Sequence, residues 1–137
     1  MVELRELELD VDAERDGVWA TFDGDFELRV ASSTSREYED AYARAIEPHL
    51  HRMRSGTLPK EVEEQVDREV TARYLVRDWR GLTRDGAPVP CTPDEAVALL
   101  ARPGMYRLLR FVRAVAANPA RYRAALLEEA RKNSPPA

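Results

Sequence analysis

Hydrophobic and polar positions alternate with a period of two over the first eleven residues. The alternation slips by one residue at Arg5–Glu6. Its apolar positions are Val2, Leu4, Leu7, Leu9 and Val11. A period of two places apolar side chains on one face of a strand. We therefore expect a strand over residues 2–11 whose other face is in solvent.

The next apolar positions predict a hairpin over residues 17–32. A two-residue loop would pair Thr21 with Phe26 and mix the two faces of the hairpin. A three-residue loop over residues 23–25 keeps one face apolar, because pairing in a sheet alternates between faces. It aligns Val18, Ala20 and Phe22 with Phe26, Leu28 and Val30. We expect the three-residue loop.

Beyond the hairpin the apolar positions recur every three or four residues, which predicts helices. A first helix within residues 32–56 begins with a capping box at Thr34 and Glu37 and ends near Gly56. Pro48 lies inside it and should kink or split it.

Four further helices are expected after residue 58. The second runs from Pro59 to Trp79, and the third begins at Thr92, which has proline and glutamate in its first turn. The fourth begins near Pro103, and the fifth follows Asn118–Pro119. Inward positions of the fifth helix are Tyr122, Ala125, Leu126 and Ala130.

These elements predict an α+β fold that is mainly α, with an N-terminal strand and hairpin followed by a bundle of four to five helices. The chain of 137 residues is long enough to bury one core, so we expect a single domain over 1–137. Its β part covers 1–31, its helical part 32–130 and a frayed tail 131–137.

Residues 78–95 combine turn and cap chemistry, and we interpret them as the joint of a scaffold rather than a site of chemistry. Glycines and prolines there end one helix, form a tight turn and lead to the next helix. Trp79 should pack over the turn, with its indole N–H bonded to a carbonyl. The joint residues are Trp79, Gly81, Asp85, Gly86, Thr92 and Glu95.

Charge is distributed unevenly along a chain of net charge −4. Residues 1–31 carry ten acidic side chains and three arginines, whereas residues 101–137 carry two acidic and eight basic side chains. One interpretation is a dipolar surface whose ends attract each other within or between subunits. The other is a basic surface for nucleic acid. We consider it weaker because the arginines at 107, 110 and 113 flank an apolar helix.

The candidate catalytic residues lack partners. His49 and His51 are two residues apart, which directs them to nearly opposite faces of a helix and excludes a shared metal. Cys91 has no histidine nearby in sequence to activate it. The carboxylates between residues 61 and 69 scatter around a helix. We expect a protein that is not an enzyme and holds no cofactor and no metal.

The chain also lacks the roughly 20 consecutive apolar residues of a membrane span. Its acidic N-terminus is unlike a signal peptide. A single cysteine, Cys91, fits a reducing compartment. We therefore expect an intracellular protein with no membrane partner.

Residues 70–125 resemble the C-terminal half of the tail assembly chaperones of long-tailed bacteriophages and related prophages. The shared features are the order and spacing of an aromatic-glycine helix end, an Asp-Gly turn, prolines, a Thr-Pro-Asp helix start and a late tyrosine. They lie here at Trp79, Gly81, Leu82, Asp85, Gly86, Pro88, Pro90, Thr92 and Tyr122.

The resemblance implies a protein of the bacterial host cytoplasm that coats the aggregation-prone tape measure protein during tail assembly. It also implies recruitment of tail tube subunits and release before the virion matures. Separately, we expect the protein to self-associate. A permanent minor structural protein of the tail and a small nucleic-acid-binding regulator remain as alternatives, although nucleic acid is the less favoured partner.

A holdase needs apolar side chains beyond those its own core consumes. Residues 96–116 supply a surplus on more than one helix face. The candidate partner-binding residues are Leu99, Leu100, Met105, Leu108, Leu109, Phe111, Val112 and Val115. Phe111 and Val115 fall off the main stripe, and we expect these two to be exposed. The alternative is that all eight fill the core.

Overall fold

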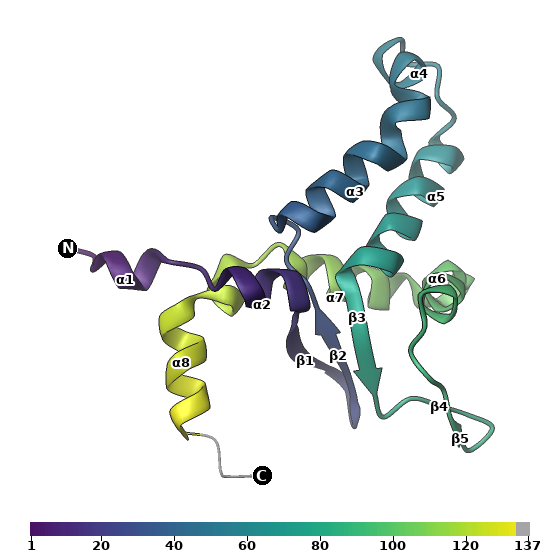
Figure 1. The fold of residues 1–137 in the computed structure, drawn as a ribbon. Helices are drawn as coiled ribbons and strands as arrows, with labels where there is room; N and C mark the ends of the chain where they lie inside the picture. The colour runs from purple at the N-terminus through teal and green to yellow at the C-terminus, as the bar shows by residue number, and fades with distance from the viewer. Residues whose placement is uncertain (134–137) are drawn as a thin grey trace.

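An antiparallel sheet of three strands lies at the centre of this computed structural model, which describes residues 1–133 (Figure 1). The strands are β1 (Val18–Asp23), β2 (Phe26–Val30) and β3 (Val76–Arg80), in the order β1-β2-β3. The first two form the predicted hairpin. The third arrives from the middle of the chain and pairs with β2, so the hairpin becomes a sheet only through a long-range contact.

The predicted arrangement of a β part followed by a helical bundle is wrong. β3 lies inside the region expected to be helical, and most of residues 1–16 is helical where a strand was expected. The fold is mixed α+β and mainly α. Its helices pack in pairs and against the sheet rather than as one bundle, because the sheet occupies the centre.

The N-terminal segment forms two short helices, α1 (Leu4–Leu7) and α2 (Val11–Asp16). The Asp10 carboxylate caps α2 by accepting a 3.0 Å hydrogen bond from the Ala13 N–H. Leu9 makes only an isolated bridge to Arg123. An alternating segment without a neighbouring strand cannot bury its apolar face as a sheet, so the predicted strand does not form.

The hairpin keeps the predicted face alignment with a different loop. Val18 pairs with Val30 and Ala20 with Leu28, as expected. The loop has two residues, Gly24 and Asp25, and a bulge at Phe22 adds the residue that a three-residue loop would have supplied. The ring of Phe22, the bulged residue, packs against the ring of Phe111, and their centroids are 5.1 Å apart.

The first long helix is split as predicted. α3 (Arg36–Ile46) and α4 (Leu50–Arg54) are separated by a 3₁₀ turn that contains Pro48. The cap lies one residue later than expected, since Ser35, not Thr34, accepts the hydrogen bond from the Tyr38 N–H at 3.3 Å.

The second helix, α5 (Lys60–Val70), is shorter than predicted. It continues as a π-helical turn, η2 (Thr71–Leu75), and then enters β3 directly. Val76 and Trp79 are buried in β3 while Arg77 is exposed. Pairing with β2 therefore decides the conformation here over the helical spacing of the preceding residues.

The rest of the chain follows the predicted order. A small hairpin precedes α6, which starts at the Thr92 cap as expected. The elements are β4 (Thr83–Arg84), β5 (Ala87–Pro88), α6 (Pro93–Ala101), η3 (Pro103–Met105), α7 (Tyr106–Ala116), η4 (Pro119–Tyr122) and α8 (Ala124–Asn133). α6 and α7 pack together, and α7 also covers β1 and β2.

The core lies between the sheet, η2, α6 and α7. Tyr122 is fully buried, as predicted, but Leu126 on α8 is 49% exposed where an inward position was expected. Residues 131–133 of the expected frayed tail belong to α8, and residues 134–137 lie outside the described part. Within residues 1–133, no helix combines the length and apolar character that crossing a membrane requires.

Candidate protein-binding surfaces

The eight candidate partner-binding residues lie in or against the core. Leu99, Leu100, Leu108, Val112 and Val115 are buried, and Met105, Leu109 and Phe111 are partly buried and packed against them. The expectation that Val115 is exposed is wrong, because only 3% of it is accessible. More than one face of α7 is apolar because the helix contacts the sheet, α6 and η2 together. These side chains offer no open groove.

Trp79 connects β3 to the segment before α6. Only 6% of its surface is accessible, and its indole N–H donates a 2.8 Å hydrogen bond to the Val89 carbonyl. Gly81 ends β3 rather than a helix and has φ of +83°. A Cβ atom at this position would collide with the backbone carbonyl of Asp25, which lies in the hairpin loop. The end of β3 therefore lies in close contact with the loop that connects β1 to β2.

The other joint residues act locally. Asp85 and Gly86 have φ of +51° and +82°, the signs that a type I′ turn requires, and they connect β4 to β5. The Thr92 hydroxyl accepts a 3.1 Å hydrogen bond from the Glu95 N–H at the start of α6. Their geometry is that of turns and caps.

Of the candidate reactive groups, Cys91 is held in an unreactive state and the two histidines belong to no metal-binding cluster within residues 1–133. Burial, together with the negative charge of Asp78, raises the pKa of the Cys91 thiol to about 11. A thiol with this pKa is almost fully protonated near neutral pH and is a poor nucleophile. His49 and His51 join no cluster: residues 1–133 contain no group of three or more His, Cys, Asp or Glu side chains that could hold a metal ion.

An open groove lies between α3 and α5. The two helices project together from the sheet (Figure 1). We call it the α3–α5 groove. It has a volume of about 360 Å³. Ala41 and Val70 at the groove are buried, so the accessible part of its apolar lining is smaller than the full set. The lining consists of the apolar residues Ala41, Ala45, Val66, Val70 and Tyr74 and the charged residues Arg44, Glu69 and Arg73. The Tyr74 side chain is 37% exposed.

Two of the charged residues that line the groove, Glu69 and Arg73, form ion pairs. The Arg73 guanidinium lies 3.3 Å from the Glu69 carboxylate and 3.1 Å from that of Asp94 on α6. Arg73 and Tyr74 both belong to η2, and π-helical turns occur frequently at functional sites. The spacing of Val66, Val70 and Tyr74 was visible in the sequence, but spacing cannot distinguish a groove from a core.

A second surface is the N-terminal arm, residues 1–9. Its apolar side chains Leu4 and Leu7 are 74% and 59% exposed. The arm is attached to the body by hydrogen bonds at its base, from the Ala124 N–H to the Glu8 carbonyl at 2.9 Å and from the Asp10 N–H to the Tyr122 carbonyl at 2.7 Å. α1 packs against α8 (Figure 1).

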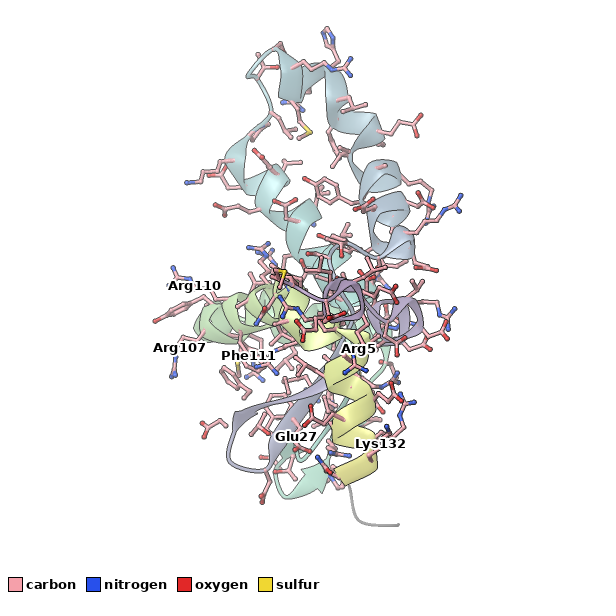
Figure 2. All side chains as sticks on the ribbon, turned by 90° about the vertical axis from the view of Figure 1, so that its left-hand side faces the viewer. Arg5, Glu27, Arg107, Arg110, Phe111 and Lys132 are labelled. Atoms are coloured by element: carbon pink, nitrogen blue, oxygen red, sulfur yellow. The ribbon has the colours of Figure 1, made fainter. Side chains whose placement is uncertain are left out.

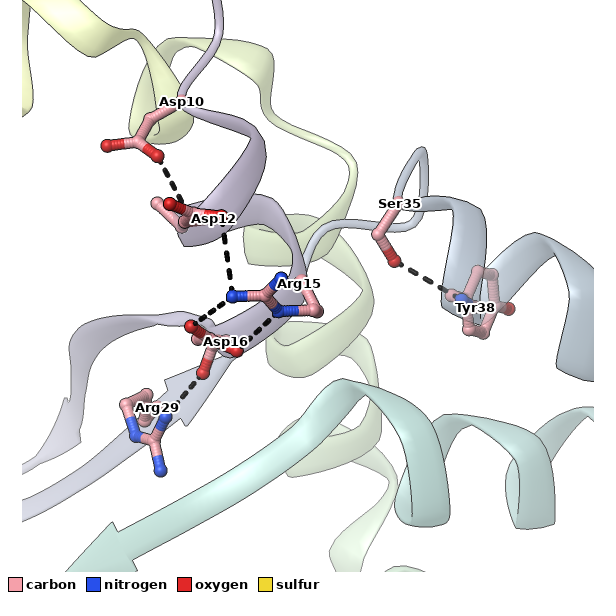
Figure 3. Close-up of polar contacts among 8 residues, drawn as sticks. Asp10, Asp12, Arg15, Asp16, Arg29, Ser35 and Tyr38 are labelled. Carbon is pink, nitrogen blue, oxygen red and sulfur yellow. Dashed lines mark hydrogen bonds and ion pairs between the residues drawn. The ribbon is translucent and has the colours of Figure 1, made fainter.

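The acidic groups of the arm differ from those of α2. In α2 the Arg15 guanidinium lies 3.4 Å from Asp12 and 2.9 Å from Asp16, so these carboxylates are neutralised locally (Figure 3). Arg15 also lowers the pKa of Asp16 through its hydrogen bond. Within the described residues, the carboxylates of Glu3, Glu6 and Glu8 in the arm form no ion pair.

A third surface is the exposed side of α7, which we call the arginine face. It consists of Tyr106, Arg107, Arg110 and Arg113, all of them exposed. The Arg110 guanidinium lies 5.6 Å from the Tyr106 ring centroid, in cation–π geometry. None of the three arginines forms an ion pair within residues 1–133. Figure 2 shows Arg107 and Arg110 projecting from α7, apart from Arg5 on α1.

Comparison with known proteins identifies the origin of the chain. The model of the YdaY prophage protein family matches residues 32–133. Neither the curated proteins nor the solved structures gave a match. The family match spans α3 to α8, and with them the groove, the joint and the arginine face, and it begins after the hairpin. Because it covers most of the chain, this protein belongs to the YdaY prophage protein family.

Proposed function

We propose that this prophage protein is a tail assembly chaperone that holds a helical segment of the tape measure protein in the α3–α5 groove. It would act in the cytoplasm of the bacterial host, where tails are assembled. Three observations support the proposal: the resemblance over residues 70–125, the prophage family and the open groove. The groove is the observation that carries it, because Ala45, Val66 and Tyr74 leave apolar surface accessible there.

The groove suits a helix as its ligand. An amphipathic helix binds by laying its apolar side chains into a hydrophobic groove. Ala45 on α3 is partly exposed and has a small side chain, so a client backbone can approach it closely. Arg44, Glu69 and Arg73 also line the groove, and such charges keep an occupied groove soluble and select polar groups beside the apolar side chains of the client.

The test is co-expression with the tape measure protein of the same prophage, measuring how much client remains soluble. Ala45→Arg fills the groove with a long charged side chain, and Tyr74→Asp places a charge on its apolar lining. Both variants should lose most of the soluble client. Leu126→Asp is the matched control because Leu126 is also an exposed apolar residue but lies on α8, away from the groove.

Substitutions in the core are unsuitable for this test. Leu108→Asp would bury a charge at a site that is 1% exposed, so it would report on folding. The groove variants must therefore keep the circular dichroism spectrum and the thermal midpoint of the wild type. Equal recovery of soluble client without this protein, or with both groove variants, would contradict the proposal.

A second measurement separates a chaperone from a permanent tail component. A chaperone leaves before the virion matures, so mass spectrometry of purified virions should find the tape measure protein without this chain. Stoichiometric amounts in mature particles would favour the structural role.

A further inference from the structure

We propose that the N-terminal arm of one copy docks on the arginine face of α7 of the next copy, so that the protein assembles head to tail. The inference is independent of the client proposal, since neither surface lines the α3–α5 groove. It follows from charge, from exposed apolar surface and from the position of the arm.

Charge complementarity identifies the occupant of the arginine face. From residue 96 to residue 127 the chain contains no acidic side chain, so α7 has no neutralising partner along its own segment. The arm presents the opposite charge, with Glu3, Glu6 and Glu8 against a single Arg5. Both sets are exposed and free of ion pairs within the described residues. Each surface therefore supplies the charge that the other lacks.

The arginine face and the arm also carry exposed apolar side chains that can pack against each other. Tyr106 is 58% exposed beside Arg107 and Arg110, and the aliphatic stems of these arginines extend its apolar surface. Leu4 and Leu7 in the arm alternate with its glutamates and are largely exposed. An aromatic ring flanked by arginines is a common composition of interface centres. Leucines flanked by glutamates complement it.

The arm is held away from the arginine face of its own copy. Hydrogen bonds at Glu8 and Asp10 attach its base to the segment around Tyr122, and α1 rests on α8. The start of α7, which carries Tyr106, lies beside α6 instead. Figure 1 shows α1 and α6 on opposite sides of the molecule. The contact therefore joins different copies, and a heterologous contact of this kind produces rings or open chains.

A second copy fits the arginine face better than nucleic acid does. The whole chain carries a net charge of −4, which opposes the approach of a polyanion. The exposed leucines of the arm would also remain uncovered on a nucleic-acid complex. Docking of the arm of a second copy supplies negative charge to the arginine face and also covers these leucines.

Sedimentation velocity over a range of concentrations tests the contact with the full chain. The average mass should rise with concentration at about 0.1 M salt and fall toward the monomer at about 1 M, where the Debye length shortens to about 3 Å. The double variant Arg107→Glu/Arg110→Glu should weaken association by at least about tenfold. Arg52→Glu/Arg54→Glu reverses the same number of exposed charges on α4 and should assemble like the wild type.

A mixing experiment identifies the two surfaces as each other's partners. Glu3→Lys/Glu6→Lys gives a basic arm and should also prevent assembly. Mixing this variant with Arg107→Glu/Arg110→Glu should restore it, because each reversed surface then meets a complementary one. A general effect of net charge or a folding defect would not produce this rescue.

Three outcomes would overturn the inference. The wild type could remain monomeric at all concentrations, or it could assemble equally after both reversals and in high salt. In the third outcome, the protein does not self-associate but binds a duplex DNA probe, and Arg107→Glu/Arg110→Glu abolishes that binding. This result would assign the arginine face to nucleic acid.

Discussion

The Tyr122 hydroxyl donates a 2.9 Å hydrogen bond to the backbone carbonyl of Val30, linking two fully buried residues that are 92 positions apart. The backbone carbonyl of Tyr122 accepts a hydrogen bond from the Asp10 N–H at 2.7 Å. One residue thus joins the sheet, the segment before α8 and the base of the N-terminal arm.

Tyr122→Phe should lower the free energy of unfolding by about 1–3 kcal/mol, because the buried Val30 carbonyl loses this donor. Urea titration measures the change. Tyr106→Phe is the control, since the Tyr106 ring is 58% exposed and its substitution should change stability by less than about 0.5 kcal/mol. Equal effects of the two substitutions would contradict the role of the hydrogen bond.

The same residue makes stability depend on alkaline pH. Burial raises the pKa of Tyr122 above its ordinary value of 10.0, so the phenol ionises more readily in the unfolded chain. The stability that it contributes is complete below pH 10 and decreases as the pH rises above that value toward the folded pKa. Unfolding titrations above pH 10 should therefore show a steeper loss for the wild type than for Tyr122→Phe.

Gly81 and Gly86 form a matched pair for testing the sheet edge. Their φ angles are +83° and +82°, so alanine meets the same backbone strain at both, about 1–2 kcal/mol. Only Gly81 faces an obstacle, the Asp25 backbone carbonyl, whereas no atom lies within 4 Å of a Cβ at Gly86. Gly81→Ala should therefore destabilise the protein clearly more than Gly86→Ala in thermal denaturation. Similar losses would show that the hairpin loop moves aside without cost.

Trp79 is expected to contribute both packing and a hydrogen bond. Trp79→Ala should lower the free energy of unfolding by roughly 3–5 kcal/mol, as truncation of a buried aromatic side chain does. Trp79→Phe keeps an aromatic ring but removes the donor to the Val89 carbonyl, which should account for about 1 kcal/mol of any loss. A loss below about 1 kcal/mol for Trp79→Ala in denaturant titration would mean that the side chain is solvated.

Cys91 should react slowly with thiol reagents. Burial raises its pKa from 9.0 to about 11, so at pH 8 the native thiolate should be at least about tenfold scarcer than in the urea-unfolded chain. The stability linked to the neutral thiol is complete below pH 9.0 and is lost as the pH rises toward about 11. Asp78→Asn removes a nearby negative charge and should speed the reaction with Ellman's reagent, which is the measurement. Equal rates in native and unfolded protein would contradict this.

Local chemistry determined the features that the sequence predicted correctly. Thr92 starts α6 because its hydroxyl satisfies a free N–H in the first turn. Pro48 splits the first helix because it lacks an N–H. The Val18–Val30 and Ala20–Leu28 pairs follow from a short hairpin in which one face is apolar. Each depends on residues close together in the sequence.

Only the tertiary structure decided which periodic segments became strands and which apolar stripes stayed open. Residues 76–80 follow a helix yet form β3, because β2 offers an unpaired edge. Residues 2–11 alternate like a strand yet find no edge, so they remain an arm with exposed leucines. The stripe on α7 is covered by the sheet, whereas on α5 Val70 is buried and Val66 stays partly exposed in a groove. The sequence specifies the period of a pattern, but burial is a property of the surface that the rest of the chain brings against it.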